Sequence, residues 1–343
     1  MSIADKYQVV QSTKTSQISS ILLATLIIVL FAAPYWAGSG DLRLLSEIFL
    51  YLSLAILWNL LAGYAGLVSI GQQAFVGFGG YILFSLAMFA NIPPLLAVPV
   101  AGLAGAIVAV PIAFLVFRLR GAYFAIGTWV VAEVFRLVFA QISSLGGGSG
   151  TSLPATIVKS IASTKSMREA TTYWVILSIV VLILLSVYFF LRSKNGIALR
   201  AIKDNELAAE SFGINIWRTK FVIYIATAAL TSTTGALIYL QKLRISPEAA
   251  FSVNDWTAIV IFMVVIGGIG SIEGPIIGVI LYFILREILA DLGTIYLLVL
   301  GCVAIVIMLR APRGVWGYFR DRYNIELFPI KRSVVLKNNN RVN

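Results

Sequence analysis

The chain has 343 residues, 59% of them hydrophobic and only 12% charged, with a net charge of +11 and a mean hydropathy of +0.93. Soluble domains run at about 45–50% apolar and about 25% charged residues. This composition therefore excludes an ordinary soluble protein and predicts an integral membrane protein.

Several residue types that catalysis needs are missing or rare. The chain has no histidine, which excludes histidine-based triads and zinc–histidine sites. No lysine follows a glycine, so there is no phosphate-binding loop, and any ATP that the protein uses must be hydrolysed by a partner. The one cysteine, Cys302, excludes an internal disulfide, and we expect it to lie in helix packing.

Apolar runs of about 20 residues predict membrane-spanning helices. The first of them follows a long polar leader (residues 1–17), which favours a retained helix over a cleaved signal. We predict an all-α, polytopic membrane protein of about ten spans (eight to ten), with a transmembrane domain over 18–310 and a basic tail over 311–343. In chain order the candidate spans are Ile18–Trp36, Leu44–Leu61, Ala74–Ala90, Leu95–Phe117, Tyr123–Ile142, Tyr173–Leu191, Phe221–Leu240, Trp256–Gly270, Pro275–Leu289 and Leu292–Leu309.

The positive charge indicates the orientation of these spans. With ten spans both termini lie on one side, and the segments on that side hold 18 of the 26 basic residues and seven of the 15 acidic ones. The whole excess of positive charge thus falls on one face. Because cytoplasmic loops are enriched in Lys and Arg, we predict that both termini are cytoplasmic. Residues 143–172 then form a long periplasmic loop, and the polar end of the tail, Lys337–Asn343, is predicted to be disordered.

The longest internal cytoplasmic segment contains a predicted amphipathic helix, Ile197–Phe212. Asn195 suits its N-cap, and Gly213 suits the left-handed position after its end. One stripe of the helix is apolar, formed by Ala198, Ala201, Ile202, Ala208, Ala209 and Phe212. Periodicity alone leaves two interpretations open: a solvated connector between spans, or a helix that docks in the groove of a partner.

Family resemblance favours the second interpretation. The stretch Asn195–Leu237 contains the pattern R-A-I-x-x-N-E-x-A-A-E-x-x-G-I, and Gly63–Tyr81, Arg118–Arg136 and Gly267–Gly278 carry further motifs. Over about Leu44–Trp316 the chain resembles ABC importer permeases of the branched-chain amino acid class, LivM type. The family often has histidine where this chain has Gln72, so the resemblance leaves the substrate open. It implies that residues 195–213 are a cytoplasmic coupling helix whose ATPase-contacting residues are Arg200, Asn205, Glu206, Ala208, Ala209, Glu210 and Gly213.

The resemblance also implies the assembly. The chain is expected to be a non-catalytic permease subunit in a bacterial inner membrane, moving branched-chain or related amino acids inward by ATP-driven alternating access. The implied partners are a second, LivH-like permease, two cytoplasmic ATPase subunits, a periplasmic solute-binding protein and membrane lipids, with no nucleic acid. No cofactor or metal is expected on this chain, and ATP is used by the partners.

Glycine-rich breaks and polar groups within spans suggest where the solute passes. Gly66-x-x-Ser69-Ile70 and Gly268-x-x-Ser271-Ile272 match each other, and glycine-interrupted spans often mark a transporter's pathway. Glu133 and Arg136 lie three residues apart, so they can pair on one helix face. Close helix packing and a structural ion pair explain these features equally well. The candidate pathway residues are Gly71, Gln72, Gln73, Tyr123, Glu133, Gly268 and Gly270.

Three alternatives stay open at this stage. A urea or short-amide permease of the same family would share every motif above. An ion-coupled secondary transporter would need an intramembrane ionisable group, for which Glu133 is the candidate. A membrane enzyme would need clustered acids or histidines, which the sequence lacks.

Overall fold

The computed structural model describes residues 7–10, 14–289, 295–311, 313–323, 327–328 and 333–336. Within these ranges, eight helical segments are long and apolar enough to cross a membrane. They are Ser39–Tyr64, Gln72–Phe89, Pro94–Val116, Ala122–Ala140, Lys165–Arg192, Ile216–Lys242, Pro247–Gly267 and Leu298–Arg320. The other two predicted spans are shorter, an apolar segment at Ile21–Tyr35 and the 16-residue helix Glu273–Ile288. The polytopic all-α fold is confirmed.

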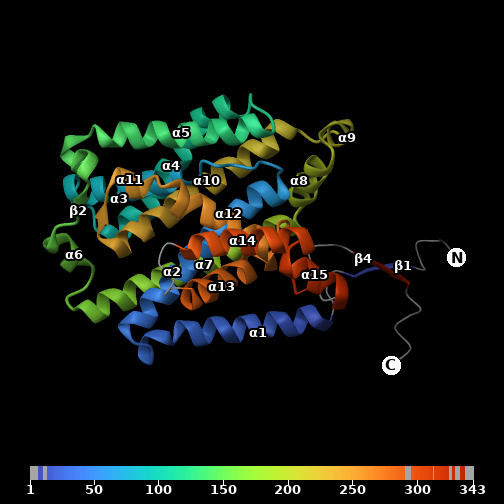
Figure 1. Cartoon of the computed structure of the whole chain (residues 1–343), viewed down its shortest axis with the longest axis horizontal. Coiled ribbons are helices and arrows are strands. Elements are labelled where there is room, and N and C mark those ends of the chain that lie inside the picture. Colours follow the sequence, from blue (N-terminus) through green and yellow to red (C-terminus); the bar gives the residue numbers. More distant parts are fainter. Residues whose placement is uncertain are drawn as a thin grey trace.

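The elements follow one another with short connections (Figure 1). The helices are α1 (Lys14–Phe31), α2 (Ser39–Asn59), α3 (Gln72–Phe89), α4 (Pro94–Val116), α5 (Ala122–Ala140), α6 (Ala155–Ile161), α7 (Lys165–Arg192), α8 (Lys194–Asp204), α9 (Glu206–Ser211), α10 (Ile216–Lys242), α11 (Pro247–Ala250), α12 (Ile259–Gly267), α13 (Glu273–Ile288), α14 (Ile295–Arg310) and α15 (Gly314–Tyr323). Two π-helices, η3 (Leu60–Tyr64) and η6 (Asn254–Ala258), extend α2 and precede α12. The strands are β1 (Tyr7–Val10), β2 (Thr151–Ser152), β3 (Arg244–Ile245) and β4 (Ser333–Leu336).

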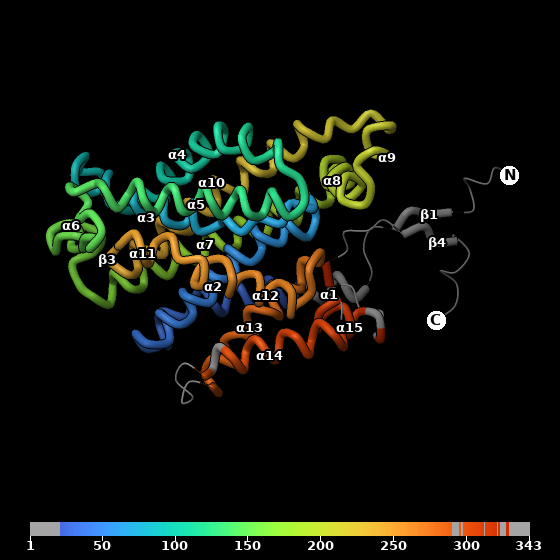
Figure 2. The backbone as a smooth tube through the Cα atoms, turned by 45° about the horizontal axis from the view of Figure 1, so that its top comes forward, coloured from blue at the N-terminus to red at the C-terminus, as the bar shows by residue number. Residues whose placement is uncertain are grey.

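Helices α2 and α10 form the centre of the bundle. Helix α10 packs against α3 and α4, and α2 packs against α7, α10, α12 and α13. The stretch Thr231–Gly235 of α10 is buried and consists of small side chains. Small residues at a membrane helix interface let the backbones approach closely. Helix α5 lies at the edge of the bundle, packed mainly against α3 (Figures 1 and 2).

The two ends of the bundle differ in what they carry. Helices α8 and α9 lie at one end, here called the coupling end, together with β1 and β4 (Figure 1). Helix α6 and the paired strands β2 and β3 lie at the other, here called the loop end (Figures 1 and 2). Strand β1 pairs antiparallel with β4, so these two strands share one end, as an even number of spans requires. That the coupling end is cytoplasmic stays a prediction.

One expectation about this fold is wrong, and another lies outside the described residues. Cys302 is exposed on α14, so the prediction that it lies in helix packing is wrong. The spacing of apolar residues cannot distinguish an inward-facing position from an outward one on a helix that is apolar all round. The predicted disorder of Lys337–Asn343 and parts of the leader (1–6 and 11–13) fall outside the described residues.

Candidate functional site

The predicted coupling helix is two helices. We expected one helix over Ile197–Phe212 with Asn195 as its N-cap, but α8 begins at Lys194 and ends at Asp204. Asn205 adopts an extended backbone, and its Oδ1 accepts a hydrogen bond at 3.0 Å from the Ala208 amide, which caps α9. Asparagine is a poor interior helix residue and a good cap, so the chain breaks here and α9 takes a new direction.

The predicted end of this segment is confirmed. Gly213 has φ +79°, the left-handed region that favours glycine. Its amide donates to Glu210 O at 2.8 Å, and the Ile214 amide donates to Ala209 O at 3.2 Å. These two bonds form a Schellman motif, which satisfies carbonyls at the helix end.

Helix α9 presents apolar side chains to the outside of this chain. Leu207 is 77% exposed and Phe212 is 85% exposed, whereas Ala209 is buried. Glu206 forms an ion pair with Lys220 at 2.5 Å, which ties α9 to the first turn of α10. Next to α9 lies a cavity of about 980 Å³, bounded by Gly66–Val68, by Leu119–Ala122 with Phe124 and Ala125, and by the start of α10.

Helix α8 is anchored to the bundle, unlike α9. Leu199 and Ile202 are buried beneath it. The Arg200 guanidinium donates to Leu191 O at 3.3 Å and lies 5.9 Å from the centre of the Tyr64 ring. Lys203 Nζ donates to Gly63 O at 2.6 Å. The candidate coupling helix therefore contacts η3, the π-helix in which the first glycine break begins.

The two glycine breaks meet at the end of α2. Asn59, which is 2% exposed, accepts a hydrogen bond on Oδ1 from the Gly270 amide and donates through Nδ2 to Ser271 O, both at 2.8 Å. A Cβ on Gly63 would collide with the backbone nitrogen of Gly270. Residues about 210 positions apart are thus in direct backbone contact, and only glycine allows this approach.

The first break also contacts α5. Trp58 Nε1 donates to Ser69 O at 2.8 Å, and the Ile70 amide donates to Thr128 Oγ1 of α5 at 3.1 Å. Gly71 lies against the Thr128 carbonyl so closely that a Cβ would collide with it. Neighbouring residues of α2, Trp58 and Asn59, thus hold the carbonyls of the two matching serines, Ser69 and Ser271.

The candidate pathway residues fall in three separate places. Gly71, Gln72 and Gln73 are inside the helix packing, where Gln72 Nε2 donates to Leu54 O and Gln73 Oε1 accepts from Thr257. Gly268 and Gly270 form the second break at the coupling end. Tyr123, which is 74% exposed, and Glu133 lie on the open side of α5.

The pairing of Glu133 with Arg136 is confirmed. Arg136 Nη2 lies 2.5 Å from Glu133 Oε1, and Arg136 Nη1 lies 3.4 Å from Glu248 Oε2. The sequence pattern gave no reason to include Glu248, because it comes from α11, 112 positions along the chain.

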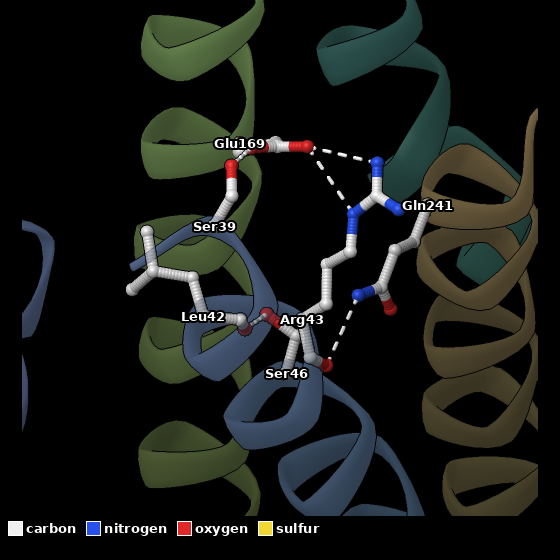
Figure 3. Close-up of polar contacts among 6 residues, drawn as sticks. All are labelled: Ser39, Leu42, Arg43, Ser46, Glu169 and Gln241. Carbon is white, nitrogen blue, oxygen red and sulfur yellow. Dashed lines mark hydrogen bonds and ion pairs between the residues drawn. The ribbon is translucent and has the colours of Figure 1, made fainter. Parts of the chain in front are cut away.

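A second ion pair lies at the loop end, and it is built differently (Figure 3). Arg43 of α2 donates to Glu169 Oε1 of α7 through Nε at 3.2 Å and Nη2 at 2.9 Å, and Ser39 donates to the same carboxylate. Gln241 of α10 donates to the backbone oxygen of Arg43 at 3.4 Å. This cluster joins three helices within the chain.

Three residues that make these contacts were not predicted from the sequence. Lys203 occupied an unremarkable polar position of an amphipathic helix, so no pattern indicated its bond to Gly63. Asn59 did carry a signal, since a polar side chain within a predicted span needs a partner or a function. Thr128 carried none, because threonine is common in membrane helices.

The comparisons with known proteins agree with this architecture. Residues 42–309 match the family described as branched-chain amino acid transport system / permease component. The chain belongs to this family. It is 26% identical over 328 residues to the high-affinity branched-chain amino acid transport system permease protein LivM of Escherichia coli, covering 89% of this chain and 77% of that one. The LivM protein of Salmonella typhimurium gives the same figures.

This chain also resembles a second kind of permease, named LivH. The probable branched-chain amino acid transport permease protein LivH of Methanocaldococcus jannaschii is 26% identical over 270 residues, covering 72% of this chain and 82% of that one. No solved structure gives a significant match. The chain is a multi-pass membrane permease, and its relatives are transport permease proteins.

Proposed function

We propose that this permease is a transmembrane subunit of a bacterial ABC importer that moves branched-chain amino acids into the cell. It works with a second, LivH-like permease, two cytoplasmic ATPase subunits and a periplasmic solute-binding protein. The ATPases bind and hydrolyse ATP, and this chain converts their movement into alternating access.

One observation carries the proposal: the exposed apolar surface of α9 at the coupling end. Leu207 and Phe212 are 77% and 85% exposed on a helix whose polar residues make it unsuitable for the bilayer core. An amphipathic helix with uncovered apolar anchors fits a groove on a partner protein. Arg200, Asn205, Glu206, Ala208, Ala209, Glu210 and Gly213 build or orient this surface, and we assign the ATPase contact to it.

The connection from α8 to the glycine breaks supports the coupling role. Lys203 bonds the carbonyl of Gly63, and Asn59 bonds Gly270 and Ser271 in the second break. A displacement of α8 therefore acts directly on two irregular backbone segments rather than on the middle of a rigid helix. Short π-helical stretches such as η3 are frequent at functional sites.

The test is copurification of the ATPase subunits with the membrane subunits. Replacing both Leu207 and Phe212 with Ser removes the apolar anchors, and we expect the ATPases to be lost while the two permeases stay together. Ser211→Ala is the control, because Ser211 is exposed on the same helix and its hydroxyl donates to Leu207 O within α9. Unchanged copurification with the double variant would show that α9 is not the contact.

The solute class needs its own measurement. Leucine, urea and acetamide are offered in parallel to proteoliposomes that contain the complete importer. We expect ATP-dependent accumulation of leucine only. Uptake of urea or acetamide without uptake of leucine would leave the importer function standing, but it would show that the solute is not a branched-chain amino acid.

A further inference from the structure

The side of α5 that faces away from the bundle is largely uncovered. Only 22% of its spanning window is buried, against 72% for the windows of α2 and α3. Val130, Val134 and Leu137 are each more than half exposed on this side. Such a surface faces either lipid or a partner, and apolar residues alone do not decide between them.

Charged groups on this side of α5 indicate that it faces a partner or water rather than lipid. Glu133 and Arg136 side chains are 45% and 31% exposed, and Glu248 of α11 is 86% exposed. Glu133 lies seven residues before the end of α5 at Ala140, which places it about 10 Å along the helix from that end. Ionisable groups at such depth face the interior of an assembly or water rather than acyl chains.

The cluster of Glu133, Arg136 and Glu248 has unused capacity for a ligand. A guanidinium has five N–H donors, and Arg136 uses Nε and Nη2 on Glu133 and Nη1 on Glu248. With two carboxylates to one guanidinium the cluster carries a net negative charge. It therefore offers acceptors for an ammonium beside remaining donors for a carboxylate.

The face of α5 also leads from this cluster toward the cavity at the coupling end. The wall of that cavity includes Ala122 and Ala125 in the first turn of α5. Trp129 and Val130, four and three residues before Glu133, lie between the two on the same helix face, and they are 48% and 54% exposed. One helix face thus links a charged cluster near the loop end to the cavity beside α9.

We propose that the cluster of Glu133, Arg136 and Glu248 binds the zwitterionic head of the transported amino acid, on a face of α5 that the second permease subunit covers. The carboxylates of Glu133 and Glu248 hold the ammonium, and the free N–H groups of Arg136 hold the carboxylate. This inference rests on the proposed function, since it takes the solute and the second permease from it.

The test uses the complete importer in proteoliposomes with leucine-loaded binding protein at saturation. Glu133→Gln, Arg136→Met and Glu248→Gln are each expected to lower leucine turnover about tenfold or more, because charge-assisted bonds to the solute are lost. The double variant Glu133→Gln/Arg136→Met separates a binding role from a structural one. An ion pair that only stabilises the fold suffers most when one charge is left unpaired, whereas a binding site stays inactive when both are gone.

Turnover in the double variant close to wild type would overturn the proposal. Size-exclusion chromatography checks that each variant still assembles. If the wild-type importer itself does not take up leucine, the proposed function is wrong. If only the double variant behaves like wild type, the function stands and the site on α5 is wrong.

A second measurement tests the surroundings of α5 without relying on activity. In a Cys302→Ser background, Val130→Cys is treated with a charged, membrane-impermeant thiol reagent, and Ile107→Cys on α4 is the control. Both positions are exposed in the single chain, at 54% and 71%. We expect Cys at 130 to react and Cys at 107 not to. A Cys at 130 that reacts no faster than the Cys at 107 would show that this face of α5 does not line a water-accessible pathway, and would overturn the proposal.

Discussion

The two ends of this permease hold their helices together in different ways. At the loop end α2 is joined to α7 by an ion pair between side chains, Arg43 to Glu169. At the coupling end the contacts that join α8 and α2 to the glycine breaks run to backbone atoms at glycines, as between Lys203 and Gly63 or Asn59 and Gly270. The loop end should therefore tolerate the loss of a charge, while the coupling end should not tolerate added volume.

The largest effect is expected at the glycine contact. A Cβ at Gly63 would meet the Asn59 side chain and the Gly270 backbone, and backbone cannot move aside as a side chain can. Overpacking of this kind costs about 1–3 kcal/mol, and here it separates the two breaks. We expect Gly63→Ala to lower the thermal unfolding temperature and abolish uptake.

Gly40→Ala is the matched control for that substitution. Gly40 lies in the first turn of α2, and apart from its chain neighbours and its own helix backbone no described atom lies within 4 Å of the position its Cβ would take. Alanine is favoured over glycine within a helix by about 0.5–1 kcal/mol, so this variant should be as stable as wild type or more so. If Gly63→Ala and Gly40→Ala had the same unfolding temperature and the same uptake, the coupling end would not be more sensitive to added volume than the loop end.

An intermediate effect is expected for the Lys203 contact. Lys203→Met keeps the length of the side chain but loses the bond to Gly63 O, and a bond with a charged partner contributes about 1.5–3 kcal/mol. We expect ATP hydrolysis by the assembled importer to persist while leucine uptake falls about tenfold. The ratio of ATP hydrolysed to leucine imported measures this directly.

Lys194→Met serves as the control for Lys203. Lys194 is exposed in the first turn of the same helix, so both variants lose one positive charge from α8. An unchanged ratio in Lys203→Met, or an equal rise in Lys194→Met, would show that the bond to Gly63 does not transmit movement.

The smallest effect is expected at the loop-end ion pair. Glu169→Gln keeps the volume and an acceptor but removes the charge opposite Arg43. The Glu169 side chain is 11% exposed, but the charge that remains, on Arg43, is 59% exposed and stays solvated. Partly exposed pairs of this kind contribute about 1 kcal/mol or less. Thermal unfolding should shift slightly and leucine uptake should be unchanged, whereas a loss of uptake would make this end part of the transport machinery.

The sequence predicted the parts of this structure that depend on local pattern. Apolar runs located the spans, the three-residue spacing found the Glu133–Arg136 pair, and Gly213 marked the end of α9. The break at Asn205 was missed because good helix formers surround it, and its capping role depends on local geometry. Contacts such as Lys203 to Gly63 join residues 140 positions apart, which no single-sequence periodicity encodes.

The most direct test of the coupled-importer account is leucine uptake by proteoliposomes with and without the ATPase subunits. The account predicts accumulation only when both permeases, the ATPases, the binding protein and ATP are present, and none when the permeases alone are given an ion gradient. Leucine uptake by this chain on an ion gradient, without ATPase or ATP, would contradict the account and identify a secondary transporter.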